Sequence, residues 1–332
     1  MTAAALPAFV HDLGHGVFAI DTGFHRGDFD AAYLVVEDGH AVFVDTGATP
    51  GVSRLLAALD ALGIDRGRVD HVIPTHVHLD HAGGAGVLMR ELPAATMLIH
   101  PRGERHMIDP AALIAGATAV YGEAEMQRSY GQIAPVPASR VRVTHDGMTL
   151  DWRGRRITVL DTPGHARHHH CLFDHRSRCW FTGDTFGLSY PEFSTDQGPW
   201  LLPTTTPVQF EPEALKDSIR RMLAFEPEGV YLTHFSRVGR SADQVRALGA
   251  ALIDQVDEMV QVADRLRGVG EPRALHAALK GALAEVMLAR ARANGCRLTD
   301  PQMLDLLSVD LELNAQGLAI WMAKSAPQGT AA

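Results

Sequence analysis

The feature that most constrains this chain is a short segment rich in histidine and aspartate, residues 75–81, which read Thr-His-Val-His-Leu-Asp-His. It follows an apolar run and precedes a glycine-rich turn. A strand that ends here places His76 and His78 on the same side, because side chains alternate along a strand. Asp80 and His81 then follow in the turn toward the next helix. Imidazole and carboxylate are ligands that zinc, iron and manganese accept without thiolates, so the segment predicts a metal site at a strand end.

Composition agrees with a site built on imidazole. The 332 residues include 18 histidines but only 3 cysteines, too few for a disulfide scaffold or a thiolate zinc array. The net charge of −9 argues against a nucleic-acid partner, because neutralising phosphates requires a dense basic surface. The N-terminus lacks the basic residues of a secretory signal, and no apolar run approaches the roughly 18 residues that span a bilayer. We therefore expect a cytoplasmic protein that does not enter a membrane.

The organisation of the chain changes at about residue 240. Before it, short apolar runs alternate with helical patterns, and the runs 32–36 and 41–44 flank an Asp-Gly pair typical of a hairpin. Such a mixture without repeats predicts a layered α/β domain. After it, apolar residues recur every three or four positions over 245–266, which indicates helices that pack on the domain, shape its pocket or form a homodimer contact. The predicted regions are an α/β domain over 1–240, a helical region over 241–325 and a disordered tail over 326–332.

With the pattern His-x-His-x-Asp-His, the sequence resembles the metallo-β-lactamase-fold superfamily of metallohydrolases. The resemblance predicts further ligands downstream, each at the end of a strand, and His165, Asp184 and His234 follow β-rich runs in that order. It covers about residues 10–240, and Asp45, in Asp-Thr-Gly, resembles the early motif of the family. The fold that it implies is a four-layer αββα sandwich with a C-terminal helical appendage.

The resemblance also implies a role for each residue. The implied ligands are His76, His78 and His165 for a first metal ion, Asp80, His81 and His234 for a second, and Asp184 as the bridge between both. Asp80 and Asp184 are the implied catalytic residues, while Asp45 and His169 would orient ligands from behind. Two divalent ions, with zinc expected and iron or manganese as alternatives, lower the pKa of a shared water, so a metal-bridging hydroxide attacks the substrate. The predicted reaction is hydrolysis of a small carboxylic ester, lactone or thioester.

The motifs do not assign the chain to one subfamily of this superfamily. Members related to glyoxalase II carry a glycine where this chain has His168, and lactonase-type members carry their substrate-orienting tyrosine closer to the bridging aspartate than Tyr190. A phosphodiesterase or nuclease on the same scaffold is one alternative, and it would require a basic cleft, for which Arg167, Arg237 and Arg240 are the nearby candidates. An iron-dependent oxidoreductase similar to the persulfide dioxygenases is the other, and it would use a single iron.

An irregular segment over 188–211, rich in proline and aromatic residues, follows the bridging aspartate. Long segments of this kind are often functional lids, so we expect Tyr190, Phe193 and Trp200 to line the substrate pocket. The alternative is a structural cover over the helical region. His100 ends a predicted strand and could also line the pocket, although buried histidines at such positions more often find a backbone partner.

Overall fold

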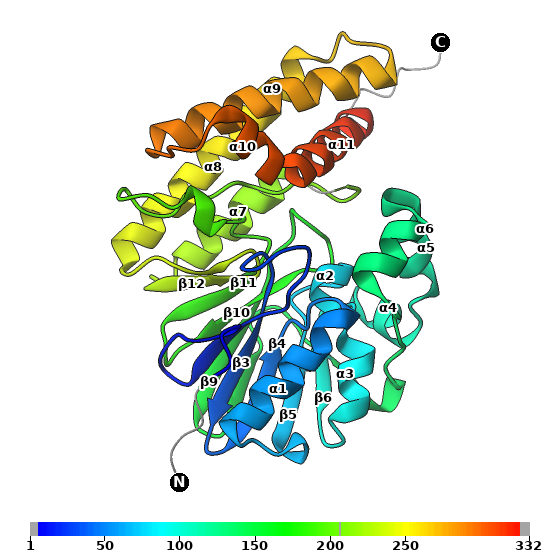
Figure 1. The fold of residues 1–332 in the computed structure, drawn as a ribbon, viewed down its shortest axis with the longest axis vertical. Helices are drawn as coiled ribbons and strands as arrows, with labels where there is room; N and C mark the ends of the chain where they lie inside the picture. The colour runs from blue at the N-terminus through cyan, green and yellow to red at the C-terminus, as the bar shows by residue number, and fades with distance from the viewer. Residues whose placement is uncertain (1–5, 206, 326–332) are drawn as a thin grey trace.

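In the computed structural model, residues 6–205 and 207–325 are described, and their strands form two mixed sheets (Figure 1). The seven-stranded sheet holds, in spatial order, β1 (Val10–Asp12), β2 (Val17–Asp21), β3 (Ala31–Glu37), β4 (His40–Val44), β5 (Val69–Ile73), β6 (Thr96–Ile99) and β7 (Val141–Val143). The six-stranded sheet holds β13 (Ser236–Val238), β12 (Gly229–Leu232), β11 (Cys179–Gly183), β10 (His170–Asp174), β9 (Arg155–Asp161) and β8 (Thr149–Trp152). The predicted tail over 326–332 lies outside the described residues.

The hairpin expected from the Asp-Gly pair is confirmed. Strands β3 and β4 pair antiparallel and Glu37 lies opposite His40, which leaves a loop of two residues. Asp38 and Gly39 adopt φ angles of 49° and 72°, the left-handed conformation that a tight hairpin loop needs at both positions.

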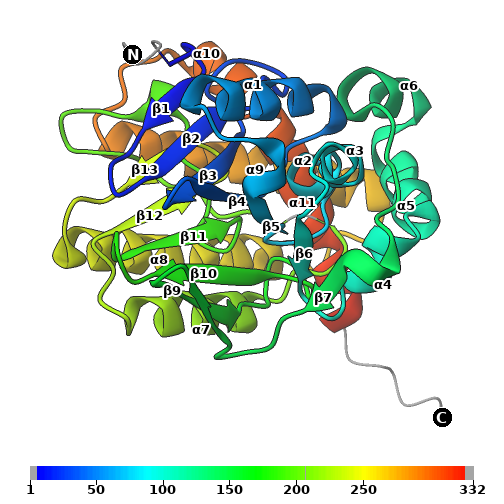
Figure 2. The same cartoon turned by 90° about the horizontal axis from the view of Figure 1, so that it is seen from below.

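Helices cover the outer faces of both sheets, so the predicted αββα order is confirmed. Helices α1 (Val52–Leu62) and α3 (Ala85–Glu91) share an apolar core with the first sheet, and α7 (Pro212–Leu223) shares one with the second. A third core, which includes Tyr33 and Phe181, fills the space between the sheets. Figure 2 shows the two sheets edge-on between these helical layers. The remaining helices before residue 240 are α2 (Leu79–Ala82), α4 (Glu104–Ile108), α5 (Ala111–Tyr121) and α6 (Glu123–Glu125).

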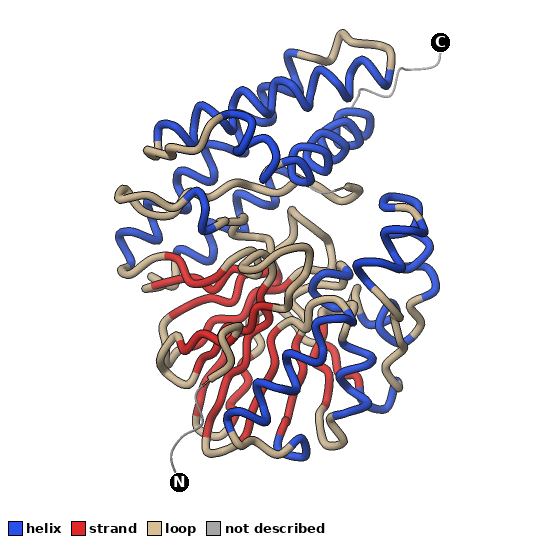
Figure 3. The backbone as a smooth tube through the Cα atoms, in the orientation of Figure 1, coloured by secondary structure: helices blue, strands red, loops and turns tan. Residues whose placement is uncertain are grey.

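The C-terminal region is helical, as expected. It consists of α8 (Ala242–Arg265), α9 (Pro272–Ala293), α10 (Asp300–Leu306) and α11 (Ser308–Ser325). These helices pack together across one end of the sheets (Figure 3). Their apolar side chains, such as Leu252 and Leu318, continue the core that begins at Trp180 of the second sheet. No helix in the described ranges combines the length and the apolar character needed to cross a bilayer.

This topology brings several strand ends to one edge. Strands β4, β5 and β6 are mutually parallel, as are β11 and β12, and β9 runs the same way because two antiparallel pairings separate it from β11. The loops that leave these strands therefore meet at the edge beneath the C-terminal helices (Figure 1). This edge holds the histidines and aspartates singled out from the sequence.

Candidate metal centre

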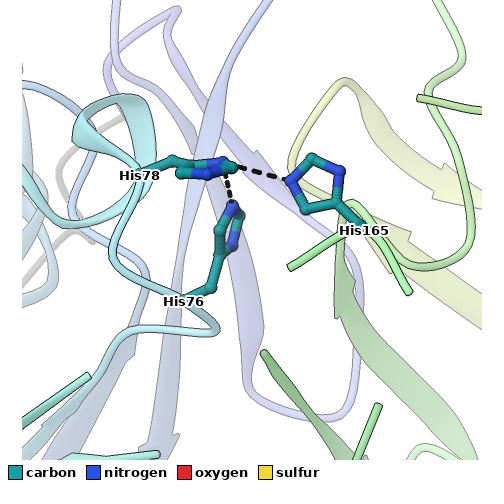
Figure 4. A group of neighbouring side chains, drawn as sticks. All are labelled: His76, His78 and His165. Atoms are coloured by element: carbon teal, nitrogen blue, oxygen red, sulfur yellow. Dashed lines mark hydrogen bonds between the residues drawn. The ribbon is translucent and has the colours of Figure 1, made fainter. Parts of the chain in front are cut away.

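Three histidines from two loops converge on one point. His76 and His78 follow β5, and His165 follows β9. The Nε2 atom of His76 lies 2.9 Å from Nδ1 of His78, and Nε2 of His165 lies 3.1 Å from the same atom (Figure 4). Burial lowers the pKa of His78 to about 3 and lowers the pKa values of His76 and His165 as well. All three rings are thus neutral at pH 7, which is the form of imidazole that binds metal.

A second cluster lies beside the first. The carboxylate oxygen Oδ2 of Asp80 is 3.7 Å from Nε2 of His81 and 3.4 Å from Nε2 of His234. Burial alone would lower the pKa of both histidines, but the neighbouring carboxylates reverse this, and the pKa of His234 rises to about 9. His81 and His234 in turn hold the pKa of Asp80 well below its ordinary value, although burial acts in the opposite direction.

Asp184 lies between the two clusters. Its Oδ1 atom is 3.2 Å from Nε2 of His81, and its Oδ2 atom is 3.5 Å from Nε2 of His165. One carboxylate therefore reaches the second cluster with one oxygen and the first cluster with the other. Of the described residues, three sets could each hold a metal ion: His76, His78 and His165; Asp80, His81 and His234; and His76, His81 and Asp184.

The polar atoms of this centre fit a bound cation. Nε2 of His81 and Oδ1 of Asp184 are both buried, and neither forms a hydrogen bond despite their 3.2 Å separation. A buried polar atom without a partner costs about 1–3 kcal/mol. Imidazole nitrogens and carboxylate oxygens are the donor types that zinc, iron and manganese accept, so a divalent cation would satisfy these atoms.

Asp45 supports the second cluster from behind. Its Oδ2 atom lies 3.0 Å from Nδ1 of His81 and accepts a 2.8 Å hydrogen bond from the Thr233 hydroxyl. Its Oδ1 atom accepts a 2.7 Å bond from the backbone NH of Thr75. This carboxylate turns Nε2 of His81 toward the centre. The two threonines were not singled out from the sequence, although each immediately precedes a ligand candidate.

His169 contacts the backbone of Asp184. Its Nε2 atom accepts a 3.2 Å hydrogen bond from the NH of Asp184, and its ring stacks on His76 at 4.7 Å. Gly183, which immediately precedes Asp184, has a φ of +46°. A Cβ at this position would lie 2.6 Å from Nε2 of His169. The backbone immediately before Asp184 therefore favours glycine.

The structure separates the predicted pocket residues. The hydroxyl of Tyr190 donates a 3.0 Å hydrogen bond to Asp310, and its ring lines a cavity at the metal cluster. Phe193 and Trp200 are instead buried, with ring centroids 5.0 Å apart, in the core beneath the C-terminal helices. The expectation that these two rings line the pocket needs correction, because both bury their apolar surface in the core that the second sheet shares with the C-terminal helices.

His100 has partners of its own. Its Nε2 atom lies 3.1 Å from Oδ1 of Asp161, and its Nδ1 atom accepts a 3.1 Å hydrogen bond from the backbone NH of Arg102. It is absent from the side chains that line the two cavities at the metal cluster, described next. The arrangement matches the alternative in which a strand-end histidine bonds to backbone.

Two cavities meet at the cluster, and His78, Asp80 and Tyr121 line both. The first, which we call the aromatic pocket, has a volume of about 300 Å³. It is lined by Phe24, His25, Phe29, Glu125, Arg128, Tyr130, Asp184, Leu188, Tyr190, Thr204, His234 and, from α11, Val309, Asp310 and Leu313. The second, which we call the α5 pocket, has a volume of about 290 Å³ and lies against α5. No local pattern in the sequence marked α5 or Asp310 as part of the site.

Comparison with known proteins gives relatives over most of the α/β region. A profile described as the metallo-beta-lactamase superfamily matches residues 25–234. The chain is 27% identical over 154 residues to a hydroxyacylglutathione hydrolase of Aeromonas hydrophila, which covers 46% of this chain and 45% of the relative. It is 28% identical over 207 residues to an acyl-coenzyme A thioesterase of Bos taurus. This match covers 54% of this chain and 67% of the relative. The chain thus spans about half the length of the Aeromonas relative that it matches.

The fold has a full-length counterpart among solved structures. A metallo-beta-lactamase family protein of Thermus thermophilus superposes with a TM-score of 0.61 at 18% identity, over 94% of this chain and 95% of that one. The superposition includes the C-terminal helices, because it covers nearly the whole of both chains. At this identity the likeness shows the fold alone.

Proposed function

Because the chain belongs to the metallo-beta-lactamase superfamily, we propose that it is a dinuclear metal-dependent hydrolase of small ester-type substrates, with thioesters as the first candidates. The observation that carries the proposal is the position of Asp184, whose two carboxylate oxygens face the two clusters separately. A single-metal site would leave one cluster without a function, although its donors are buried or half-buried and converge. The names of two relatives, a hydroxyacylglutathione hydrolase and an acyl-coenzyme A thioesterase, support the choice of a thioester.

The proposal assigns each of the seven ligand candidates to one or both metal ions. In this proposal, His76, His78 and His165 would hold one ion, Asp80, His81 and His234 would hold the other, and Asp184 would contact both. When bound, two divalent ions supply an activated water near neutral pH and positive charge for the developing oxyanion.

Hydrogen bonds of the protein prepare the ligands of the second ion. The NH at Nδ1 of His234 donates to the backbone oxygen of Phe29 at 2.8 Å, which directs Nε2 of the ring into the site. Asp45 does the same for His81. Since the pKa of His234 is raised to about 9 before any metal binds, metal loading must displace a proton from this ring. Metal affinity should therefore increase with pH.

A phosphodiesterase has less support. Of the three arginines that could line a basic cleft, Arg167 forms an ion pair with Glu211. Arg237 and Arg240 line a separate groove of about 710 Å³, whose lining includes none of the seven ligand candidates. The pockets at the cluster instead carry many aromatic and aliphatic side chains, which suit a substrate with little net charge, and Arg128 in the aromatic pocket forms an ion pair with Glu125.

Metal analysis and a substrate panel test the proposal. We expect about two equivalents of divalent metal per chain, and hydrolysis of acyl thioesters ahead of bis(p-nitrophenyl) phosphate. Asp184→Asn should lower kcat/KM by more than about 100-fold, beyond the usual effect of losing a residue behind a ligand. His145→Ala, which changes an exposed histidine outside both pockets, is the control and should match the parent. A protein with one iron that consumes oxygen, or an Asp184→Asn variant with parental metal content and activity, would overturn the proposal.

A further inference from the structure

Helix α5 carries small and apolar side chains around most of its circumference, and although Leu113, Ile114, Ala117 and Tyr121 are half-buried, none of its residues is fully buried. Its eleven residues read Ala-Ala-Leu-Ile-Ala-Gly-Ala-Thr-Ala-Val-Tyr, without a charge. A surface helix normally carries a polar face toward water, and an apolar surface left open usually marks a binding site. Val120 on this helix is 40% exposed, and Val208, in the segment across the cavity from it, is 52% exposed.

The open face of α5 is one wall of the α5 pocket. Leu113, Gly116, Ala117 and Val120 line the cavity, at the spacing that places residues in one stripe along a helix. Leu79, Ala112, Pro207 and Val208 add further apolar lining, and His106, His168 and Gln209 add polar groups. The stripe extends over the eight residues 113–120, or about 10 Å of helix, which is close to the length of an extended acyl chain of about eight carbons.

The inner end of this pocket lies at the metal cluster. His78 and Asp80, candidate ligands of the two ions, are among its lining side chains. The same two residues line the aromatic pocket, where the charged and hydrogen-bonding groups of Arg128, Glu125 and Asp310 lie. An apolar chamber and a more polar one thus meet at the site where the reaction would occur.

We infer that the α5 pocket binds the apolar acyl chain of the substrate, an inference that rests on the proposed hydrolase function. The scissile carbonyl then lies near His78 and Asp80, and the alcohol or thiol portion extends into the aromatic pocket. Attack of water on the carbonyl breaks the bond between the acyl carbon and the leaving oxygen or sulfur, and releases the fatty acid and a protonated leaving group. Continuity with the cluster favours a substrate chain over a second protein copy or a lipid surface as the occupant of this face.

Gly116 provides a direct test. A Cβ at this position meets nothing within 4 Å, so the first carbon of a larger side chain has open space beside the pocket that Gly116 lines. Gly116→Phe should therefore shorten the pocket while the helix stays intact. The matched control is Gly281→Phe, because Gly281 is an exposed glycine within helix α9 that also has open space around it.

The measurement is a chain-length profile of acyl thioesters with one constant leaving group, from acetyl to decanoyl. For the parent, kcat/KM should rise by about fourfold per methylene up to about eight carbons, as burial of each methylene in an apolar pocket implies. Gly116→Phe should lower kcat/KM for octanoyl by at least about tenfold and leave acetyl within about twofold, and Gly281→Phe should follow the parent. A flat parental profile, or an equal loss at all lengths in Gly116→Phe, would overturn the inference.

Calorimetric titration with octanoate separates this inference from the proposed function. The parent and Gly281→Phe should bind octanoate, and Gly116→Phe should bind it at least about tenfold more weakly. If the parent hydrolyses no ester or thioester, the proposed function fails while this titration still decides the pocket. Octanoate affinity that is unchanged in Gly116→Phe, or a parent that binds neutral phosphatidylcholine vesicles through α5 and takes up no octanoate, would overturn the acyl pocket.

Discussion

Replacing Asp45 with asparagine should weaken one of the two metal clusters and leave the other intact. The carboxylate accepts hydrogen bonds from the backbone of Thr75 at one oxygen, and at the other it contacts Nδ1 of His81 and the hydroxyl of Thr233. Asparagine keeps one carbonyl oxygen for Thr75, so its NH₂ group faces His81 and Thr233, where it can only donate. His81 then has no acceptor for its Nδ1 proton, and nothing fixes the direction of its Nε2 lone pair.

The size of the effect follows from this contact. Loss of the group that orients a ligating histidine typically weakens metal binding 10- to 100-fold, which is about 1.4–2.8 kcal/mol. Only one ligand of the Asp80, His81 and His234 cluster is affected, so the affinity of the other cluster should change by less than about threefold. Titration of chelator-stripped protein with Zn²⁺, in competition with a chromophoric chelator, resolves the two binding steps.

A matched control is Asp70→Asn. Asp70 lies on β5, the strand that leads to His76, and it accepts hydrogen bonds from Trp152 and Arg153 at 2.7 and 2.9 Å, far from the cluster. This variant should lose stability without a change in either metal affinity. If Asp45→Asn binds both ions as the parent does, or loses affinity equally at both, then Asp45 does not act through His81 and the reasoning is refuted.

Three further outcomes are expected. First, the free energy of unfolding of the metal-free protein should be greatest near pH 6.5. The pKa of His234 is raised to about 9 by Asp80 and other carboxylates despite burial, so its stabilising effect is lost as pH rises toward 9. The pKa of His78 is lowered to about 3 by burial, so stability is lost as pH falls below 6.5, where the unfolded chain gains a proton that the folded protein does not. Urea midpoints in chelator at about pH 5, 6.5 and 9 measure this, and a midpoint that rises steadily toward pH 9 would contradict it. Second, Trp200→Ala should lower the free energy of unfolding by about 3–5 kcal/mol while KM stays unchanged, because the ring belongs to the core and not to the pocket; a shifted substrate preference would restore the pocket role. Third, Gly183→Ala should destabilise the protein by more than about 1–2 kcal/mol, since left-handed strain adds to a 2.5 Å approach of the new Cβ to the Thr75 hydroxyl; a parental unfolding curve would show that the loop relaxes freely.

Short sequence patterns correctly predicted those elements of the fold that depend mainly on neighbouring residues. The Asp-Gly pair at 38–39 demands left-handed backbone at adjacent residues, and the structure has it. The apolar period of three to four over 245–266 corresponds to helix α8. By contrast, the aromatic residues of 188–211 gave no indication of which side faces the core. Phe193 and Trp200 became core residues because the C-terminal helices cover them, a fact that their own segment does not encode.

The sequence by itself determined the chemistry of the centre, through the order of histidines and aspartates behind successive strands. Parallel strands deliver their ends to one edge, so a strand-end pattern is sufficient to predict that such residues gather. Only the tertiary structure decided what surrounds them. Asp310 meets Tyr190 across 120 positions of sequence, and α5 leaves an apolar face open toward His78. Contacts of this kind depend on how whole layers pack, and the burial free energy that selects a packing is a property of the complete core rather than of any short segment.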